Sequence, residues 1–203
     1  MSQENYSFFV LAAVIAAELD KATKIAKKLS LTASNARAVA LRAGEGAAGF
    51  RPLTDFIDRL AIVTVNSSTE INALAAGLSK TAANKFRTDS AITRFNIIFK
   101  KAADSVHIKS LNYGFNRTVS TQNKLLTNYQ RQLSKLTTEL DMLKDELRTA
   151  VILATLSRVE ASQAGSLYQE SLNNVAENVE SAANDIRAHI QNSQQLVKNL
   201  QQE

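Results

Sequence analysis

Apolar residues recur along the start of the chain at alternating steps of four and three. The positions that keep this step from residue 15 onward are all apolar: Ile15, Leu19, Ala22, Ala26, Leu29, Ala33, Ala36, Ala40 and Ala43. A mean step of 3.5 residues is typical of the inward-facing seam of a coiled coil. The pattern therefore predicts one long helix over residues 5–44.

A second apolar stripe follows and predicts a helix over residues 51–86. Its members are Leu53, Ile57, Leu60, Thr64, Ser67, Ile71, Leu74 and Leu78. Between the stripes, residues 43–52 hold three of the six glycines and the only proline. Glycine tolerates the positive φ of a tight turn, and proline suits the first turn of a helix. Residues 1–87 are therefore expected to form a helical hairpin with its tip at 43–52.

The second half of the chain repeats this pattern. Glu18-Leu19-Asp20 recurs as Glu139-Leu140-Asp141, and Ala43-Gly44 recurs as Ala164-Gly165, both 121 positions later. Internal repetition at a fixed spacing is a statement about architecture. The counterpart of the first seam is Leu136, Leu140, Leu143, Leu147, Ala150, Ala154, Ser157, Ala161 and Ala164.

Beyond the second turn the spacing between the repeats falls to 115 positions. There Ile57, Leu60 and Ile71 correspond to Leu172, Val175 and Ile186. Residues 126–203 are therefore expected to form a second helical hairpin, with its turn at 163–168.

The side-chain volumes of the two seams complement each other. Where the first seam has Ala22 and Ala26 the second has leucines, and where the first has Leu29 the second has Ala150. Large residues facing small ones let a core interdigitate at constant density. We therefore predict an all-α, elongated antiparallel four-helix coiled-coil bundle built from two hairpins. A monomer and a dimer with swapped hairpins both satisfy this pattern, as does a homo-oligomer associated through its tips.

Residues 88–125 are expected to form a separate insert that caps the far end of the bundle. The second stripe loses its phase in residues 84–90, where Asp89 or Ser90 is suited to cap a new helix. Residues 112–116 (NYGFN) have the composition of a loop.

The composition argues against catalysis. The 203 residues include no cysteine and only two histidines, His107 and His189. The absence of cysteine excludes disulfides, thiol catalysis and thiolate metal sites. The glycine-rich turn lacks the preceding strand and the following Lys-Ser/Thr of a phosphate loop. We expect no enzyme activity, no metal and no cofactor, and two structural histidines.

The net charge of +5 is unevenly distributed. Residues 61–125 contain nine basic and three acidic side chains, whereas residues 126–203 contain seven and ten. This distribution fits either a solvated helical surface or a surface, over residues 80–124, for anionic membrane or nucleic acid. The basic patch consists of Lys85, Arg87, Arg94, Lys100, Lys101, Lys109 and Arg117.

The apolar run at residues 6–17 is too short to span a bilayer, which takes about 20 residues. The residues before it carry no positive charge, so the n-region of a signal peptide is missing. We expect the run to begin a buried helix and the protein to be cytoplasmic.

The segment LTASNARAVALRAGEGAAGFRPLTDFIDRLA at residues 31–61 resembles the signalling tip of bacterial methyl-accepting chemotaxis receptors. The core of the likeness is RAGE followed by GF, at Arg42–Glu45 and Gly49-Phe50. In the second repeat, residues 175–186 (VAENVESAANDI) are similar to the arm that follows the tip in that family.

The resemblance implies a helical hairpin that takes part in a four-helix bundle, two hairpins being contributed by the two subunits of a receptor dimer. In that family the tip gathers dimers into trimers and binds the chemotaxis histidine kinase and its coupling protein. This chain would correspond to one receptor dimer with its hairpins fused, binding the kinase, the coupling protein or receptor tips. The implied partner-binding residues are Val39, Arg42, Glu45, Phe50, Leu53, Glu160 and Gln163.

The chain departs from the family pattern at the tip. Val39 stands where the family has a glutamate, while in the second repeat Glu160 keeps that acid and Gln163 replaces the arginine. These departures favour a modified set of partners. Gln194-Gln195 superficially fits a methylated pair of the family, but a solvated helix end without methylation is expected there. Two rival functions stay open: the basic module described above, and a structural protein whose likeness to receptors is convergent.

Overall fold

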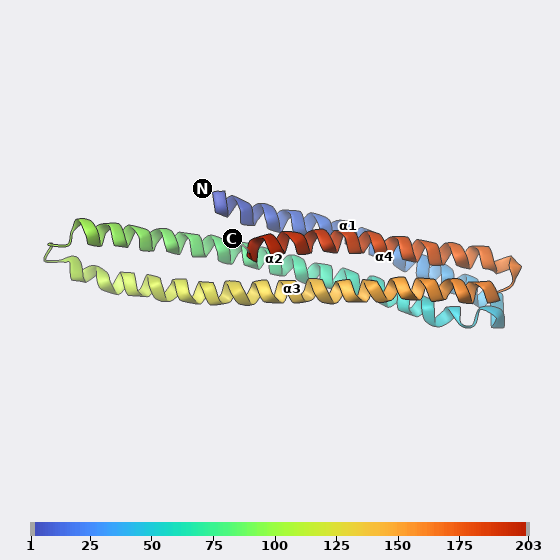
Figure 1. Ribbon diagram of the computed structural model, residues 1–203. Helices are drawn as coiled ribbons and strands as arrows, with labels where there is room; N and C mark the ends of the chain where they lie inside the picture. Colours follow the sequence, from blue (N-terminus) through green and yellow to red (C-terminus); the bar gives the residue numbers. More distant parts are fainter. Residues whose placement is uncertain (1–2, 202–203) are drawn as a thin grey trace. The chain divides into compact units, whose positions relative to one another are not determined.

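The computed structural model describes residues 3–201, with the side chains of residues 10–199 (Figure 1). It contains four α-helices: α1 (Gln3–Ala43), α2 (Phe50–Lys101), α3 (Asn112–Gln163) and α4 (Ser166–Gln201). Two short 3-10 helices, η1 (Gly44–Ala47) and η2 (Ile108–Leu111), lie in the connections. No strand occurs within residues 3–201. The protein is an all-α four-helix bundle, which confirms the fold class predicted from the 3.5-residue pattern.

The chain divides into two compact units. The bundle unit comprises residues 14–72 and 137–201, and therefore includes parts of all four helices. The hairpin unit comprises residues 3–13 and 73–136. The boundary between the units falls inside α1, α2 and α3, not at a linker.

The seam residues of α1 and α3 form the core of the bundle unit. Every seam position of α1 from Ile15 to Ala40 is buried, whereas Ala43 at the helix end is partly exposed. All nine counterparts are buried, eight on α3 from Leu136 to Ala161 and Ala164 directly after the helix. The two helices thus bury corresponding positions 121 residues apart. Polar contacts join these helices to α4. His189 of α4 is hydrogen-bonded to Glu18 of α1, and Gln194 of α4 donates a hydrogen bond to Asp141 of α3.

The predicted seam of α2 is wrong at two positions. Ser67 and Leu74 are only partly buried, while their neighbours Ser68 and Ala75 are buried. At residues 74 and 75 the prediction followed the larger side chain, whereas at residues 67 and 68 both side chains are serine and size does not distinguish them. Closely spaced helices instead place small side chains toward the bundle axis, and the larger Leu60 is buried at the flank. The observed seam is Phe50, Thr54, Ile57, Ala61, Thr64, Ser68, Ile71, Ala75, Leu78 and Ala82.

Helix α4 buries the positions that lie 115 residues after those of α2. The predicted counterparts Leu172, Val175 and Ile186 are all buried. The full seam of α4 is Leu172, Ala176, Val179, Ala183, Ile186, Ile190, Ser193 and Val197. His189 is only partly buried and lies beside this seam, next to the buried Ile190.

Both turns of the bundle unit depend on a glycine that follows the last residues of a helix. Gly44 has a φ of +65° and Gly165 has a φ of +80°. A Cβ atom at either position would meet no atom within 4 Å. The requirement for glycine is therefore conformational, since other residues rarely adopt positive φ.

The expected break and loop in residues 88–125 are wrong. Helix α2 continues without interruption to Lys101, and residues 112–116 begin α3; the connection lies at 102–111. Asp89 does not cap a helix, because its carboxylate accepts hydrogen bonds from Lys85 at 2.9 Å and Gln122 at 2.6 Å. Gly114 does not mark a loop either. A Cβ atom there would lie 3.4 Å from Cζ of Phe95, so glycine lets that ring approach α3 closely.

The apolar start of α1 is only partly buried. Val10 is 41% exposed and Val14 is 38% exposed, whereas Ile15 is buried. Residues 6–9 of the predicted apolar run lie outside the described side chains. Within the described part of the chain, none of the helices is both long and apolar enough to cross a membrane.

We expect Gly165→Ala to lower the free energy of unfolding by about 1–2 kcal/mol, because alanine strains the positive φ. Gly77→Ala is the matched control, since Gly77 lies inside α2 and its added Cβ would meet only the flexible Gln132 side chain at 3.4 Å. That variant should gain about 0.5–1 kcal/mol through helix propensity. Urea unfolding followed by circular dichroism measures both. Equal effects of the two variants would contradict the conformational role of Gly165.

We expect Ser68→Ala to raise the free energy of unfolding by about 1 kcal/mol. The Ser68 hydroxyl is buried and has no hydrogen-bond partner among the described residues, and a buried unpaired polar group is costly. Ser157→Ala is the control, because its buried hydroxyl donates to the Leu153 carbonyl at 2.8 Å. The same unfolding assay should show no gain for Ser157→Ala; a loss of stability in Ser68→Ala would refute the assignment.

Candidate protein-interaction surface

The two turns of the bundle unit close one end of the bundle together. A Cβ atom on Gly46 would lie 3.4 Å from the Gln163 carbonyl oxygen, so the first turn packs directly against the end of α3. The Glu160 carboxylate lies against Gly49, where a Cβ atom would collide with it. Ala47 and Phe50 are fully buried beneath this end. The result is a closed bundle end, formed from both halves of the chain.

Five of the seven predicted tip residues are exposed or partly exposed. Arg42, Glu45 and Gln163 are exposed. Val39 and Glu160 are partly exposed. Neither Arg42 nor Glu45 forms a side-chain hydrogen bond or ion pair with another described residue, so both charges are available to a partner.

Phe50 and Leu53 do not fit the expected role in direct partner contact. Phe50 is 0% exposed and Leu53 is 9% exposed. The Phe50 ring begins the seam of α2 and fills the closed end of the bundle. The match to the family motif at this position therefore reflects core packing in this chain.

An exposed apolar stripe lies on α3 near the closed end. Ile152, Leu156 and Val159 are 58%, 50% and 54% exposed. Their steps of four and three place them on one face of the helix, opposite the buried Ala154 and Ser157. We call these three residues the α3 stripe. Sequence reasoning missed it because only the inward seam was followed, although the second 4–3 series was visible.

Exposed aliphatic residues also occur on α1 near the same turn. Leu31 is 68% exposed and Leu41 is 58% exposed. In contrast, the outward positions of α4 between Asn174 and Gln195 are polar or alanine. Contiguous apolar surface on an otherwise polar protein marks sites of protein association.

One ion pair links the two helices of each hairpin close to this end. Arg37 Nη2 lies 2.5 Å from Asp55 Oδ1, between α1 and α2. Arg158 Nη2 lies 2.5 Å from Glu180 Oε2, between α3 and α4. The two arginines are 121 positions apart, as are the seams. These pairs occupy the inter-helix grooves and leave the α3 stripe uncovered.

The basic patch lies entirely in the hairpin unit. Lys85 forms an ion pair with Asp89 at 2.9 Å, and Arg87 Nη1 lies 3.5 Å from Asn84 Oδ1. The other five members are exposed and have no ion-pair partner among the described residues: Arg94, Lys100, Lys101, Lys109 and Arg117.

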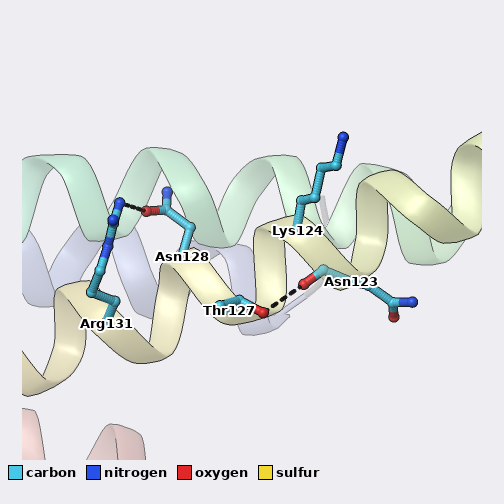
Figure 2. Close-up of a pocket in the computed structure, with 5 residues that line it drawn as sticks. All are labelled: Asn123, Lys124, Thr127, Asn128 and Arg131. Atoms are coloured by element: carbon cyan, nitrogen blue, oxygen red, sulfur yellow. Dashed lines mark hydrogen bonds between the residues drawn. The ribbon is translucent and has the colours of Figure 1, made fainter.

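A groove of about 410 Å³ also lies in the hairpin unit, along α3 (Figure 2). Arg131 Nη2 donates to Asn128 Oδ1 at 2.9 Å, and the Thr127 hydroxyl donates to the Asn123 carbonyl at 3.1 Å. The Lys124 side chain points away from these residues (Figure 2). Asn128 also donates to the Thr81 hydroxyl on α2 at 3.4 Å, so these hydrogen bonds have separate acceptors and do not converge on a common point.

His189 is part of a small polar cluster between α1 and α4. Its Nδ1 donates to Glu18 Oε2 at 2.8 Å, and Asn192 donates to the same oxygen at 3.1 Å. Lys21 donates to the other carboxylate oxygen at 2.8 Å. The Lys21 hydrogen bond, followed by those from His189 and Asn192, lowers the pKa of Glu18 from 4.5 to about 2. The cluster links α1 and α4 electrostatically.

No group of three or more His, Asp or Glu side chains suited to hold a metal ion occurs among the described residues. His107 is exposed in the connection between α2 and α3. Comparison of the chain with protein-family models, curated proteins and solved structures gives no match. The closed bundle end with the α3 stripe is the strongest candidate site, because exposed aliphatic side chains and the two charges of Arg42 and Glu45 lie there.

We expect Glu18→Gln to lower the free energy of unfolding at pH 7 by about 1–3 kcal/mol, because it removes charge-assisted hydrogen bonds. The unfolded chain protonates Glu18 near pH 4.5, but the folded chain does so only near pH 2. The stabilisation is therefore full above pH 4.5 and is lost as the pH falls through 2.

Thermal unfolding across this pH range should show the difference between Glu18→Gln and the parent shrinking on acidification. Asp20→Asn is the control, because the Asp20–Lys24 pair is largely exposed and contributes little. A difference that does not change between pH 7 and pH 2 would contradict the assigned role of the carboxylate.

Proposed function

We propose that the protein is a chemoreceptor-like helical scaffold that binds chemotaxis components through its closed bundle end. The candidate partners are the chemotaxis histidine kinase, its coupling protein and the signalling tips of receptors. The observation that carries the proposal is the α3 stripe next to a closed end with the unpaired charges of Arg42 and Glu45. No chemical step is required of the protein, because its role is to hold partners together.

The geometry supports helix-side packing as the mode of binding. Ile152, Leu156 and Val159 lie on one helix face over about two turns, the arrangement by which one helix docks on another. Arg42 and Glu45 are exposed at the turn and give a partner two opposite charges to match. Apolar contacts then supply affinity, while the charges favour one orientation over others.

The differences between the repeats support an asymmetric docking surface. The exposed Arg42 belongs to the first repeat, and its counterpart in the second repeat is the uncharged Gln163. The acid of the family pattern is present only as Glu160, which lies against Gly49. The two sides of the closed end therefore offer different chemistry. A protein of this kind would occupy positions in a receptor array without making the symmetric contacts of a receptor dimer.

We expect the double variant Arg42→Glu/Glu45→Arg to lower affinity for the partner at least tenfold, because it reverses both charges without changing the net charge. Co-sedimentation with the kinase, the coupling protein and receptor signalling fragments, each tested separately, measures the effect. Asp20→Lys/Lys24→Asp is the matched control. It swaps an exposed pair on α1 about 27 Å from Arg42 at 1.5 Å per residue.

Leu156→Ser tests the apolar part of the surface and should weaken binding about tenfold without loss of stability, because Leu156 is half exposed. The proposal would be refuted if neither the Arg42→Glu/Glu45→Arg variant nor Leu156→Ser changed binding, or if none of the three partners bound the parent protein.

A further inference from the structure

We propose that the end of the hairpin unit, residues 94–117, binds the surface of an anionic lipid membrane. Residues 94–117 belong to the hairpin unit, whereas the closed bundle end belongs to the bundle unit. We call residues 97–113, where α2 ends and α3 begins, the hairpin apex. Its chemistry combines exposed apolar side chains with unpaired cations.

Four large side chains are exposed at the hairpin apex. Val106 in the connection is 89% exposed, and Tyr113 in the first turn of α3 is 77% exposed. Ile97 and Ile98 in the last turns of α2 are 47% and 44% exposed. Exposing apolar side chains to water costs free energy, and this free energy is recovered when the side chains enter the interfacial region of a bilayer. Tyrosine is enriched at that interface because its ring is apolar and its hydroxyl is polar.

The interior of the hairpin end is packed independently of these residues. The rings of Phe95 and Phe115 meet edge to face with centroids 5.8 Å apart, and those of Phe99 and Phe115 with centroids 5.4 Å apart. Phe95 and Phe99 stack at 6.3 Å. The aromatic cluster holds α2 against α3, so the four exposed apolar residues are not needed to keep the hairpin closed. Their presence at the surface calls for another explanation.

The charges at the hairpin end fit an anionic partner. Residues 94–117 contain five basic side chains and a single acidic one, Asp104. Lys100 and Lys101 end α2, and Lys109 lies in η2, so three exposed cations surround Val106 in the sequence. Each lysine close to an anionic membrane is worth about fivefold in affinity. Lysine side chains can also reach the headgroups while apolar neighbours enter more deeply.

A membrane fits this surface better than a nucleic acid. Nucleic-acid binding needs cations along a groove and is aided by exposed aromatic rings that stack on bases. Here the phenylalanine rings pack on one another, and the exposed side chains at the hairpin apex are mainly aliphatic. Aliphatic side chains have no stacking face for a base, but they partition into lipid.

Co-sedimentation of the full chain with phosphatidylcholine vesicles, with and without phosphatidylserine, tests the proposal. We expect binding only to the vesicles that contain phosphatidylserine. Lys100→Gln/Lys101→Gln should weaken it about thirtyfold, as two lysines at about fivefold each imply. Lys27→Gln/Lys28→Gln is the matched control, because it removes the same charge from two adjacent exposed lysines in the bundle unit. Circular dichroism of each variant confirms that it is folded.

Insertion is tested with a tryptophan probe, since the chain has no tryptophan of its own. On addition of phosphatidylserine vesicles, the emission of Val106→Trp should shift to shorter wavelength. The emission of Leu167→Trp, placed at an 80% exposed position of the bundle unit, should not shift. A mixed-sequence DNA duplex and a single-stranded RNA are titrated in parallel.

The proposal is overturned if vesicles are not bound, if both lysine pairs matter equally, or if the Val106→Trp emission does not shift. Tight binding of DNA or RNA that depends on Lys100 and Lys101, without any vesicle-induced shift, would assign the basic surface to nucleic acid instead.

Discussion

The bundle unit depends on the close packing of small side chains along its axis. Alanine and serine occupy many seam positions of all four helices, and the larger seam residues fill the space between them. Ala22 and Ala26 of α1 correspond to Leu143 and Leu147 of α3, and all four are buried. In a close-packed interior, either a void or an extra methylene group costs stability. The alignment of the α1 seam with the α3 seam fixes where the turns lie and which residues remain on the surface.

The closed bundle end is a consequence of that register. Helices α1 and α3 are each followed by a turn with an alanine–glycine pair, and both glycines have positive φ. The two turns lie at the same end of the bundle and pack against each other. Phe50 fills the end from inside, and the residues exposed on the outside include the charged Arg42 and Glu45 and the uncharged Gln163. The hairpin unit follows a different principle, because only two long helix segments run side by side along most of it. Its end is held by three phenylalanine rings, and its outer surface is basic and apolar.

Several elements could be predicted because they depend on local pattern alone. The 4–3 step placed every buried position of α1 from Ile15 to Ala40 correctly, since a helix with one apolar face has one way to bury it. The glycines of both turns were found because few other residues adopt positive φ. The exposed Arg42 and Glu45 were identified by likeness to a family motif. The burial of Phe50, part of the same motif, was not predicted.

By itself the sequence determined the all-α class, the two turns and the inward seam of α1, because periodicity and backbone preference act over a few residues. Tertiary structure alone decided between Ser67 and Ser68 as seam residues, since both lie near the same face and only the neighbouring helices select one. It also decided that α2 continues through Asp89, whose carboxylate bonds to Lys85 and Gln122, the latter on α3. At position 114 glycine serves a tertiary contact within a helix, because the Phe95 ring of α2 approaches it closely. Contacts between residues far apart in the chain outweighed local signals at these positions.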